Sequence, residues 1–198
     1  MIRKLFLLII LFILFSGFAY SEKQINKKAV LIIAPFNFQD NEYFITKDEL
    51  IRSGIKIYTA SLNPEKAVSQ SGRTVKPDIG INMIRPGDFD AIVFIGGPGV
   101  TVYFENPIIK NLAIDFYKNR KITAAICIAP VILANSGILK DKNATVWDNP
   151  QKEFSSVLIK HGANYTQKPV VIDGIIITAD GPLSSSIFSR AIVIELLK

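Results

Sequence analysis

Two residue types that can take part in reaction chemistry occur only once in the 198-residue chain, as the cysteine Cys127 and the histidine His161. Cys127 directly follows an apolar run at residues 122–126 and precedes residues 128–130, which can begin a helix. A side chain between a strand and a helix lies on a sharp turn above the sheet, and a helix N-terminus favours the reactive thiolate. Cys127 is therefore the candidate nucleophile, and the alternative is a buried, unreactive core cysteine.

The composition argues against several other kinds of site. A single cysteine excludes an internal disulfide, and one cysteine with one histidine cannot form a Cys/His zinc site, so we expect no metal and no cofactor. No G-x-G-x-x-G pattern follows the first apolar run of the mature chain, which excludes the dinucleotide-binding fingerprint. The basic run at residues 118–121 is interpreted as a solvated helix end, because no nucleic-acid motif accompanies it. His161 is predicted to end a surface helix.

The first 21 residues are predicted to be a secretory signal peptide. Arg3 and Lys4 form a short basic start, residues 5–15 are apolar, and small residues follow at Ala19 and Ser21. The apolar run is shorter than the ~18 residues of a membrane span, so stable membrane insertion is not expected. We expect cleavage after Ser21 or Ala19 and a periplasmic or extracellular location. An uncleaved segment would instead tether the protein to the membrane.

Short apolar runs alternate with longer amphipathic ones along residues 28–198, which are expected to form one domain. Residues 65–84 alternate polar and apolar side chains and predict a β-excursion, and residues 170–178 predict a hairpin around Asp173-Gly174. The pattern predicts an α/β fold, a three-layer sandwich with a mainly parallel sheet covered by helices on both faces. The predicted strands are 28–35, 55–60, 89–95, 122–126 and 144–147; the predicted helices are 40–53, 105–118, 130–136, 152–160 and a last one to residue 197, capped by Ser184, Ser185 or Ser186.

Three of the predicted strands end in residues that suggest a ligand site. These ends are residues 35–42, the Gly-rich segment 96–99, and Cys127. Ligands in open parallel sheets bind beyond the carboxyl ends of the strands. If the three strands are central and parallel, their loops share one edge of the sheet and converge there.

The order of several segments resembles the ThiJ/PfpI family. The segment AAICIAPVILANSGIL is similar to the nucleophile elbow of that family, with Cys127 as its cysteine. The likeness continues through AVLIIAP, FQDNEY, ELIRSGIKIYTAS, FDAIVFIGGPG and DGIIITADGP and covers nearly the whole mature chain. The resemblance implies a flavodoxin-like fold, a small-molecule substrate and a homodimer.

The resemblance also implies roles for individual residues. Glu42 matches the glutamate that hydrogen-bonds the elbow cysteine, and burial beside a thiolate would keep its carboxyl protonated. The backbone N–H groups of Gly97 and Ile128 match the oxyanion site, and Gly96 permits a close backbone approach. A protonated Glu42 could then donate a hydrogen bond to the thiolate of Cys127 and later pass its proton to the substrate.

Other positions match the family less well. Arg52 and Arg73 fall where a branch of the family has arginines near its site and dimer contact; the alternative is two solvent-facing side chains. Ile128 and Trp147 occupy the places where family members carry a histidine near the cysteine. A Cys–His dyad is therefore not expected within this chain, which argues against peptide hydrolysis because an amine leaving group needs both a base and an acid.

These observations favour an enzyme that uses Cys127 and Glu42 on small electrophiles, most plausibly glyoxalase-like or deglycase-like handling of reactive aldehydes such as methylglyoxal. The alternative class is a redox-sensing or stress-protective, chaperone-like protein in which Cys127 is oxidised without turnover. An isocyanide hydratase-like lyase and a cysteine peptidase are weaker alternatives.

Overall fold

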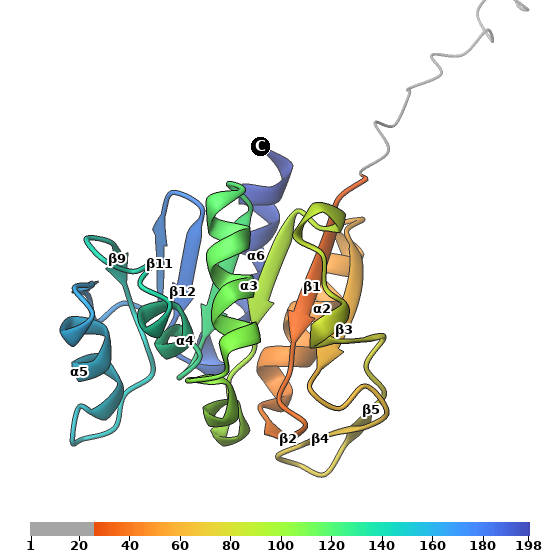
Figure 1. Cartoon of the computed structure of the whole chain (residues 1–198), viewed down its shortest axis with the longest axis horizontal. Helices are drawn as coiled ribbons and strands as arrows, with labels where there is room; N and C mark the ends of the chain where they lie inside the picture. Colours follow the sequence, from red (N-terminus) through yellow and green to blue (C-terminus); the bar gives the residue numbers. More distant parts are fainter. Residues whose placement is uncertain (1–25) are drawn as a thin grey trace, which may run out of the picture.

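The central sheet is built from the apolar runs of the sequence. The computed structural model describes residues 26–198, so the predicted signal peptide lies outside the described residues. Seven strands pair in the order β11-β12-β8-β7-β1-β3-β6, and only β11 runs antiparallel to its neighbour (Figure 1). Their bounds are β1 Lys28–Ile32, β3 Lys56–Ser61, β6 Ile79–Gly80, β7 Ala91–Phe94, β8 Ile122–Ile126, β11 Val170–Asp173 and β12 Ile176–Ala179.

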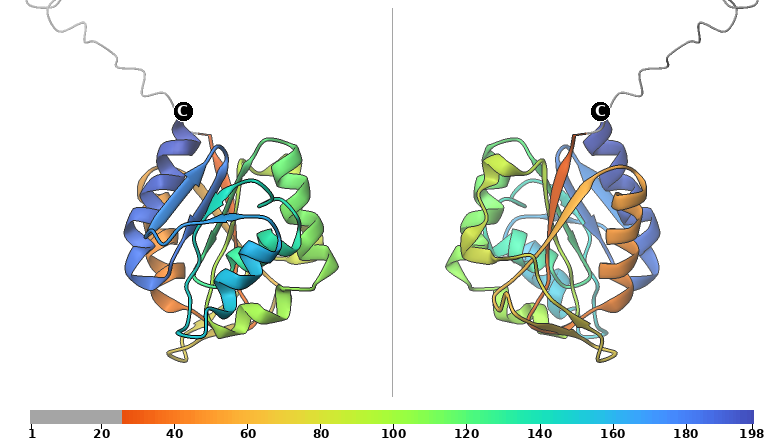
Figure 2. Two further views of the ribbon diagram at one scale, coloured as in Figure 1. Left: turned by 90° about the vertical axis from the view of Figure 1, so that its left-hand side faces the viewer. Right: turned by 90° about the vertical axis from the view of Figure 1, so that its right-hand side faces the viewer.

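Helices cover both faces of this sheet, which confirms the predicted three-layer α/β architecture. Helices α2 and α6 lie side by side on one face, and α3, α4 and α5 lie on the other (Figure 2). Because both faces are covered, strands β7 and β8 are buried at every position, as expected for continuous apolar runs in a parallel sheet. The helix bounds are α2 Asp40–Arg52, α3 Pro107–Lys118, α4 Pro130–Asn135, α5 Glu153–Lys160 and α6 Ser185–Leu197.

Two smaller sheets lie outside the central one. The predicted β-excursion contributes β4 (Ala67–Ser69) and β5 (Thr74–Val75), which pair with each other. Strand β4 also pairs with a strand that sequence patterning missed, β2 (Phe36–Phe38). The second sheet pairs β9 (Asn143–Ala144) with β10 (Asn164–Tyr165). The strand predicted at residues 144–147 is thus shorter and earlier, and residues 145–147 continue as a loop. Short 3-10 helices complete the fold at η1 Ile81–Met83, η2 Pro86–Asp88, η3 Pro98–Tyr103 and η4 Pro182–Ser184.

The predicted serine cap of the last helix is wrong in its detail. Helix α6 begins at Ser185, and the side chain of the preceding Ser184 does not bond to the helix N–H groups. Its hydroxyl donates instead to the carboxylate of Asp180, which lies four residues earlier in the chain, just before η4. Ser185 donates to the carbonyl of Pro182.

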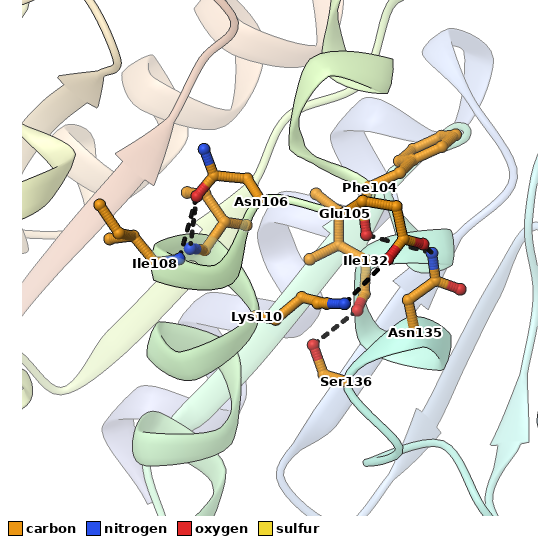
Figure 3. A network of polar contacts seen from close by, with 9 residues as sticks. Phe104, Glu105, Asn106, Ile108, Lys110, Ile132, Asn135 and Ser136 are labelled. Carbon is orange, nitrogen blue, oxygen red and sulfur yellow. Dashed lines mark hydrogen bonds and ion pairs between the residues drawn. The ribbon is translucent and has the colours of Figure 1, made fainter.

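A polar network ties α4 to α3 (Figure 3). The side chain of Asn106 caps α3 by accepting two backbone N–H groups of its first turn. Glu105 accepts from Lys110 Nζ and from Asn135 Nδ2, both at 2.8 Å, and Asn135 also donates to the carbonyl of Phe104 at 3.1 Å. Since Asn135 is the last residue of α4, the network fixes the direction in which α4 leaves the strand-to-helix turn.

The two ends of the described chain meet at the amino ends of the strands. Lys27 and Lys198 line the same surface hollow there, and both ends emerge at one edge of the sheet in Figure 1. Among residues 26–198, no helix is both long and apolar enough to cross a bilayer.

Candidate active site

Cys127 lies on the turn between β8 and α4 with a left-handed backbone, φ +63°. This conformation is sparsely populated by non-glycine residues and costs roughly 1–3 kcal/mol, so the sharp turn predicted at Cys127 is present and its backbone is strained. Two hydrogen bonds hold the turn: the Cys127 N–H donates to the Ala179 carbonyl at 3.0 Å, and its carbonyl accepts from Trp147 N–H at 2.9 Å. The side chain is lifted above the carboxyl edge of β8 and is 8% exposed.

Glu42 lies in the first turn of α2 with its side chain fully buried. The side-chain oxygen of Gln39 accepts the Glu42 N–H, and Gly96 N–H donates to Glu42 Oε2, each at 2.9 Å. Oε1 has no well-formed hydrogen bond in the resting site. The Cys127 thiol nevertheless lies near enough to lower the pKa of the Glu42 carboxyl by hydrogen bonding. The structure therefore brings Glu42 and Cys127 together.

Burial controls the protonation of this pair. Loss of solvation raises the pKa of Glu42 to about 8, and the hydrogen bonds from Gly96 and Cys127 oppose this rise only in part. The Glu42 carboxyl is therefore mostly protonated at neutral pH.

The same burial raises the pKa of the Cys127 thiol, and the neighbouring Glu42 charge raises it further. Backbone N–H groups of Gly97 and Ile128, which hydrogen-bond the sulfur, lower it by less. The expectation that the following helix favours a free thiolate is wrong for the resting site, because desolvation and the Glu42 charge outweigh the N–H groups of Gly97 and Ile128. Because thiolate and carboxylate would repel each other, the pair holds at most one negative charge, and a thiolate forms only while Glu42 keeps its proton.

Two glycines allow the segment after β7 to approach Cys127 and Glu42 closely. A Cβ at Gly96 would lie 2.5 Å from Cys127 Cβ, 2.7 Å from the Ile126 carbonyl oxygen and 2.8 Å from Glu42 Oε2. Gly97 has φ +99°, and a Cβ there would lie 2.5 Å from the carbonyl oxygen of Asn37. The segment therefore needs glycine at both positions to set its N–H groups against the sulfur and the carboxyl.

We predict that Gly96→Ala destabilises the protein by about 1–3 kcal/mol, the usual cost of overpacking, because the Ile126 carbonyl cannot move without disturbing β8. Urea unfolding followed by circular dichroism measures this change. Gly137→Ala is a control for the loss of glycine, since its Cβ would meet no atom within 4 Å, although its φ of +76° adds local strain. Equal stability of Gly96→Ala and the wild type would contradict the close approach.

A pocket of about 360 Å³ opens above the Cys127 turn. Apart from the thiol, its walls are apolar, aromatic or neutral polar groups, contributed by the loops at the carboxyl edge of the sheet. The lining residues are Gln39, Gln70, Gly97, Pro98, Thr101, Cys127, Ile128, Trp147, Phe154 and Pro182. The three strand ends singled out in the sequence thus converge on one pocket.

Sequence patterning missed two parts of this site. Gln39 both caps α2 at Glu42 and lines the pocket, and a polar side chain just before a predicted helix is the signal that could have indicated the cap. The aromatic pair Trp147 and Phe154 was not foreseen as a wall, because it depends on how the loop before α5 packs.

The two arginines expected near the site do not line the pocket. Arg52 lies in the last turn of α2, ten residues or about 15 Å along the helix from Glu42, and pairs with Glu49 at 2.9 Å. Arg73 stacks its guanidinium 3.5 Å from the ring centre of Phe44. Neither arginine therefore contributes to the pocket lining of a single chain, and their expected role near the site and dimer contact stays a prediction.

His161 is exposed and follows the last residue of α5, as predicted. Its backbone N–H donates to the carbonyl of Val157. Within residues 26–198, no group of three or more histidine, cysteine, aspartate or glutamate side chains gathers as a metal site.

We predict that His161→Ala leaves turnover and thiol alkylation unchanged within error, since the imidazole lies outside the pocket. Steady-state kinetics and iodoacetamide labelling of the two proteins measure both quantities. A loss of activity with the fold intact would show that the acid–base group has been assigned to the wrong residue.

The chain belongs to the DJ-1/PfpI family, whose model matches residues 27–195. An uncharacterised protein of Methanocaldococcus jannaschii is 35% identical over 87% of this chain and 83% of its own. A Caenorhabditis elegans protein named glutathione-independent glyoxalase DJR-1.2 is 28% identical over 85% of this chain and 88% of its own. The crystal structure of a ThiJ/PfpI domain protein from Brachyspira murdochii superposes with a TM-score of 0.83 at 32% identity, covering 87% of this chain and 97% of that one.

Proposed function

We propose that this protein is an enzyme that converts small α-oxoaldehydes to hydroxy acids, with Cys127 as nucleophile and Glu42 as acid–base group. The observation that carries the proposal is the buried, protonated carboxyl beside a strained cysteine whose sulfur receives two backbone N–H groups. The name of the C. elegans relative supports the same reaction class. The proposal includes export through the N-terminal segment and assembly as a homodimer.

The first step adds the thiol to the aldehyde. In the singly deprotonated pair, Glu42 takes the thiol proton as the sulfur forms a bond to the aldehyde carbon and the carbonyl electron pair moves to oxygen. The N–H groups of Gly97 and Ile128 donate to the resulting oxyanion, and donors of this kind are each worth ~10²–10³-fold in rate. Glu42 then returns the proton to that oxygen, which gives a hemithioacetal.

The second step moves a proton between the two carbons. The Glu42 carboxylate removes the C–H proton of the hemithioacetal and returns it to the neighbouring carbonyl carbon through an enediol. The former aldehyde carbon is oxidised to a thioester while the ketone carbon is reduced to an alcohol, so no outside oxidant is needed. Water hydrolyses the thioester, which releases the hydroxy acid and restores the thiol.

The test is methylglyoxal consumption together with lactate formation by the purified protein, beside Cys127→Ser. We expect lactate to form in proportion to the methylglyoxal consumed, and only background rates from Cys127→Ser. Consumption without lactate would indicate simple adduct formation with lysine and arginine side chains and would overturn the proposal. Equal lactate formation by the two proteins would overturn it as well.

A second candidate is a redox sensor, supported by the absence of an imidazole from the pocket lining and by the unpartnered Oε1 of Glu42. Two equivalents of peroxide would oxidise the Cys127 thiolate to a sulfinate with release of two waters, and Glu42 would donate to the sulfinate. Mass spectrometry after peroxide treatment detects the two added oxygens. Oxidation without any lactate formation would favour this candidate.

A further inference from the structure

We propose that the pocket selects uncharged carbonyl compounds with an aromatic substituent, and that Trp147 and Phe154 form the wall that binds the ring. The proposal rests on the proposed function for the reaction at Cys127, and it adds the substrate class. Phenylglyoxal, which would be converted to mandelate by the same steps, is the corresponding substrate.

The aromatic wall is placed next to the reactive sulfur. The rings of Trp147 and Phe154 lie 5.9 Å apart between centroids at 53°, and both line the pocket with Cys127. The backbone of Trp147 is fixed because its N–H donates to the Cys127 carbonyl at 2.9 Å. The indole remains 42% exposed, so the wall has apolar surface left for a ligand to cover.

The wall is also held in place from behind. A Cβ at Gly181 would lie 3.2 Å from Trp147 Cδ1, so the indole packs against the backbone at this glycine. Asp148 Oδ1 accepts the Phe154 N–H at 3.0 Å, which ties the loop that carries Trp147 to the start of α5. A wall ordered before binding requires less loss of side-chain freedom when a ring docks on it.

The charge and size of the pocket point to the same ligand class. No lining side chain is a cation, while the Cys127–Glu42 pair holds one negative charge once it loses a proton. An anionic α-oxoaldehyde such as 4-carboxyphenylglyoxal would therefore find repulsion and no cationic partner. A volume of about 360 Å³ lies within the range of pockets for ligands much larger than methylglyoxal. The methyl group of methylglyoxal would therefore leave most of the aromatic wall exposed to water.

The kinetic test compares kcat/KM for phenylglyoxal, methylglyoxal and the anionic 4-carboxyphenylglyoxal. We expect phenylglyoxal to exceed methylglyoxal by about tenfold or more and 4-carboxyphenylglyoxal to be a much poorer substrate than phenylglyoxal, as apolar pocket contacts are worth roughly 10–200-fold in discrimination. Trp147→Leu and Phe154→Leu should each reduce the advantage of phenylglyoxal by raising its KM by a larger factor than the KM of methylglyoxal. Phe104→Leu is the matched control, since Phe104 is equally a partly buried aromatic but does not line the pocket.

The binding test needs no turnover. Trp147 is the only tryptophan of the chain, so intrinsic fluorescence reports on the pocket wall. We expect acetophenone to quench Cys127→Ser saturably and acetone and benzoate to bind far more weakly, and Phe154→Leu in that background to weaken acetophenone binding several-fold. Saturable quenching without turnover of any α-oxoaldehyde would support the pocket assignment and contradict the proposed function. Turnover of methylglyoxal with no preference for phenylglyoxal and no saturable quenching would overturn the selectivity and leave the proposed function standing.

Discussion

Glu42→Gln is expected to lower kcat/KM for an α-oxoaldehyde by about 100-fold or more, the usual scale of acid–base catalysis. Glutamine keeps a hydrogen-bond donor beside Cys127 but has no proton to transfer. The wild-type kcat/KM should rise with pH through about 8, because the reactive form of the pair has lost one proton and burial sets that pKa. In Glu42→Gln, kcat/KM should show no rise near pH 8, because the carboxyl that titrates there is absent.

The matched control is Glu49→Gln, which removes a carboxyl from the same helix at a position outside the pocket. It should retain wild-type turnover and the same pH profile. Alkylation of Cys127 in Glu42→Gln should fall by much less than turnover, since alkylation needs only a thiolate. Wild-type turnover in Glu42→Gln would remove Glu42 from the mechanism.

The same substitution is expected to stabilise the protein. The pKa of Glu42 is raised from 4.5 to about 8 in the folded chain, so folding retains a proton that the unfolded chain releases above pH 4.5. The free energy of unfolding of the wild type should therefore fall as the pH rises from about 4.5 to about 8 and level off above. At pH 7 the cost of keeping this carboxyl neutral is about 3 kcal/mol at 1.36 kcal/mol per pKa unit, which Glu42→Gln does not incur.

Thermal and urea unfolding between pH 4 and pH 9 measure this effect. The difference between Glu42→Gln and wild type should be small near pH 4 and grow to a Tm gain of about 6–12 °C at pH 7, taking 2–4 °C per kcal/mol for a chain of this size. Glu49→Gln should follow the wild-type curve, because its carboxyl is paired with Arg52 near the surface. Parallel curves for Glu42→Gln and wild type across this range would mean that Glu42 is charged in the folded state.

The sequence carried enough information for the layers of the fold and for the elbow. Apolar runs indicated β1, β7 and β8. Cys127 follows the last of these runs without a turn residue before it, which indicated the sharp turn. The pKa of Cys127 could not be predicted in this way, because it depends on a balance between burial, the charge of Glu42, and the N–H groups of Gly97 and Ile128 from two different loops.

The aromatic wall and the arginines show a second limit. Trp147 and Phe154 come together through the loop before α5, and no periodic pattern describes that loop. Arg52 was expected near the site because of the family resemblance, yet the length of α2 places it about 15 Å along the helix from Glu42. Side chains of one helix lie close together only when they are on the same face and within about one turn of each other.

Because Lys27 and Lys198 line one hollow at the amino ends of the strands, both ends of the described chain lie on the side of the molecule away from the pocket. An affinity tag or a solid support attached at either end would therefore immobilise the protein with its pocket open to the solution. The closeness of the two ends also suits circular permutation: a short linker can join them, and new ends can be opened at the exposed turn around Gly174, where an added Cβ would meet no atom within 4 Å.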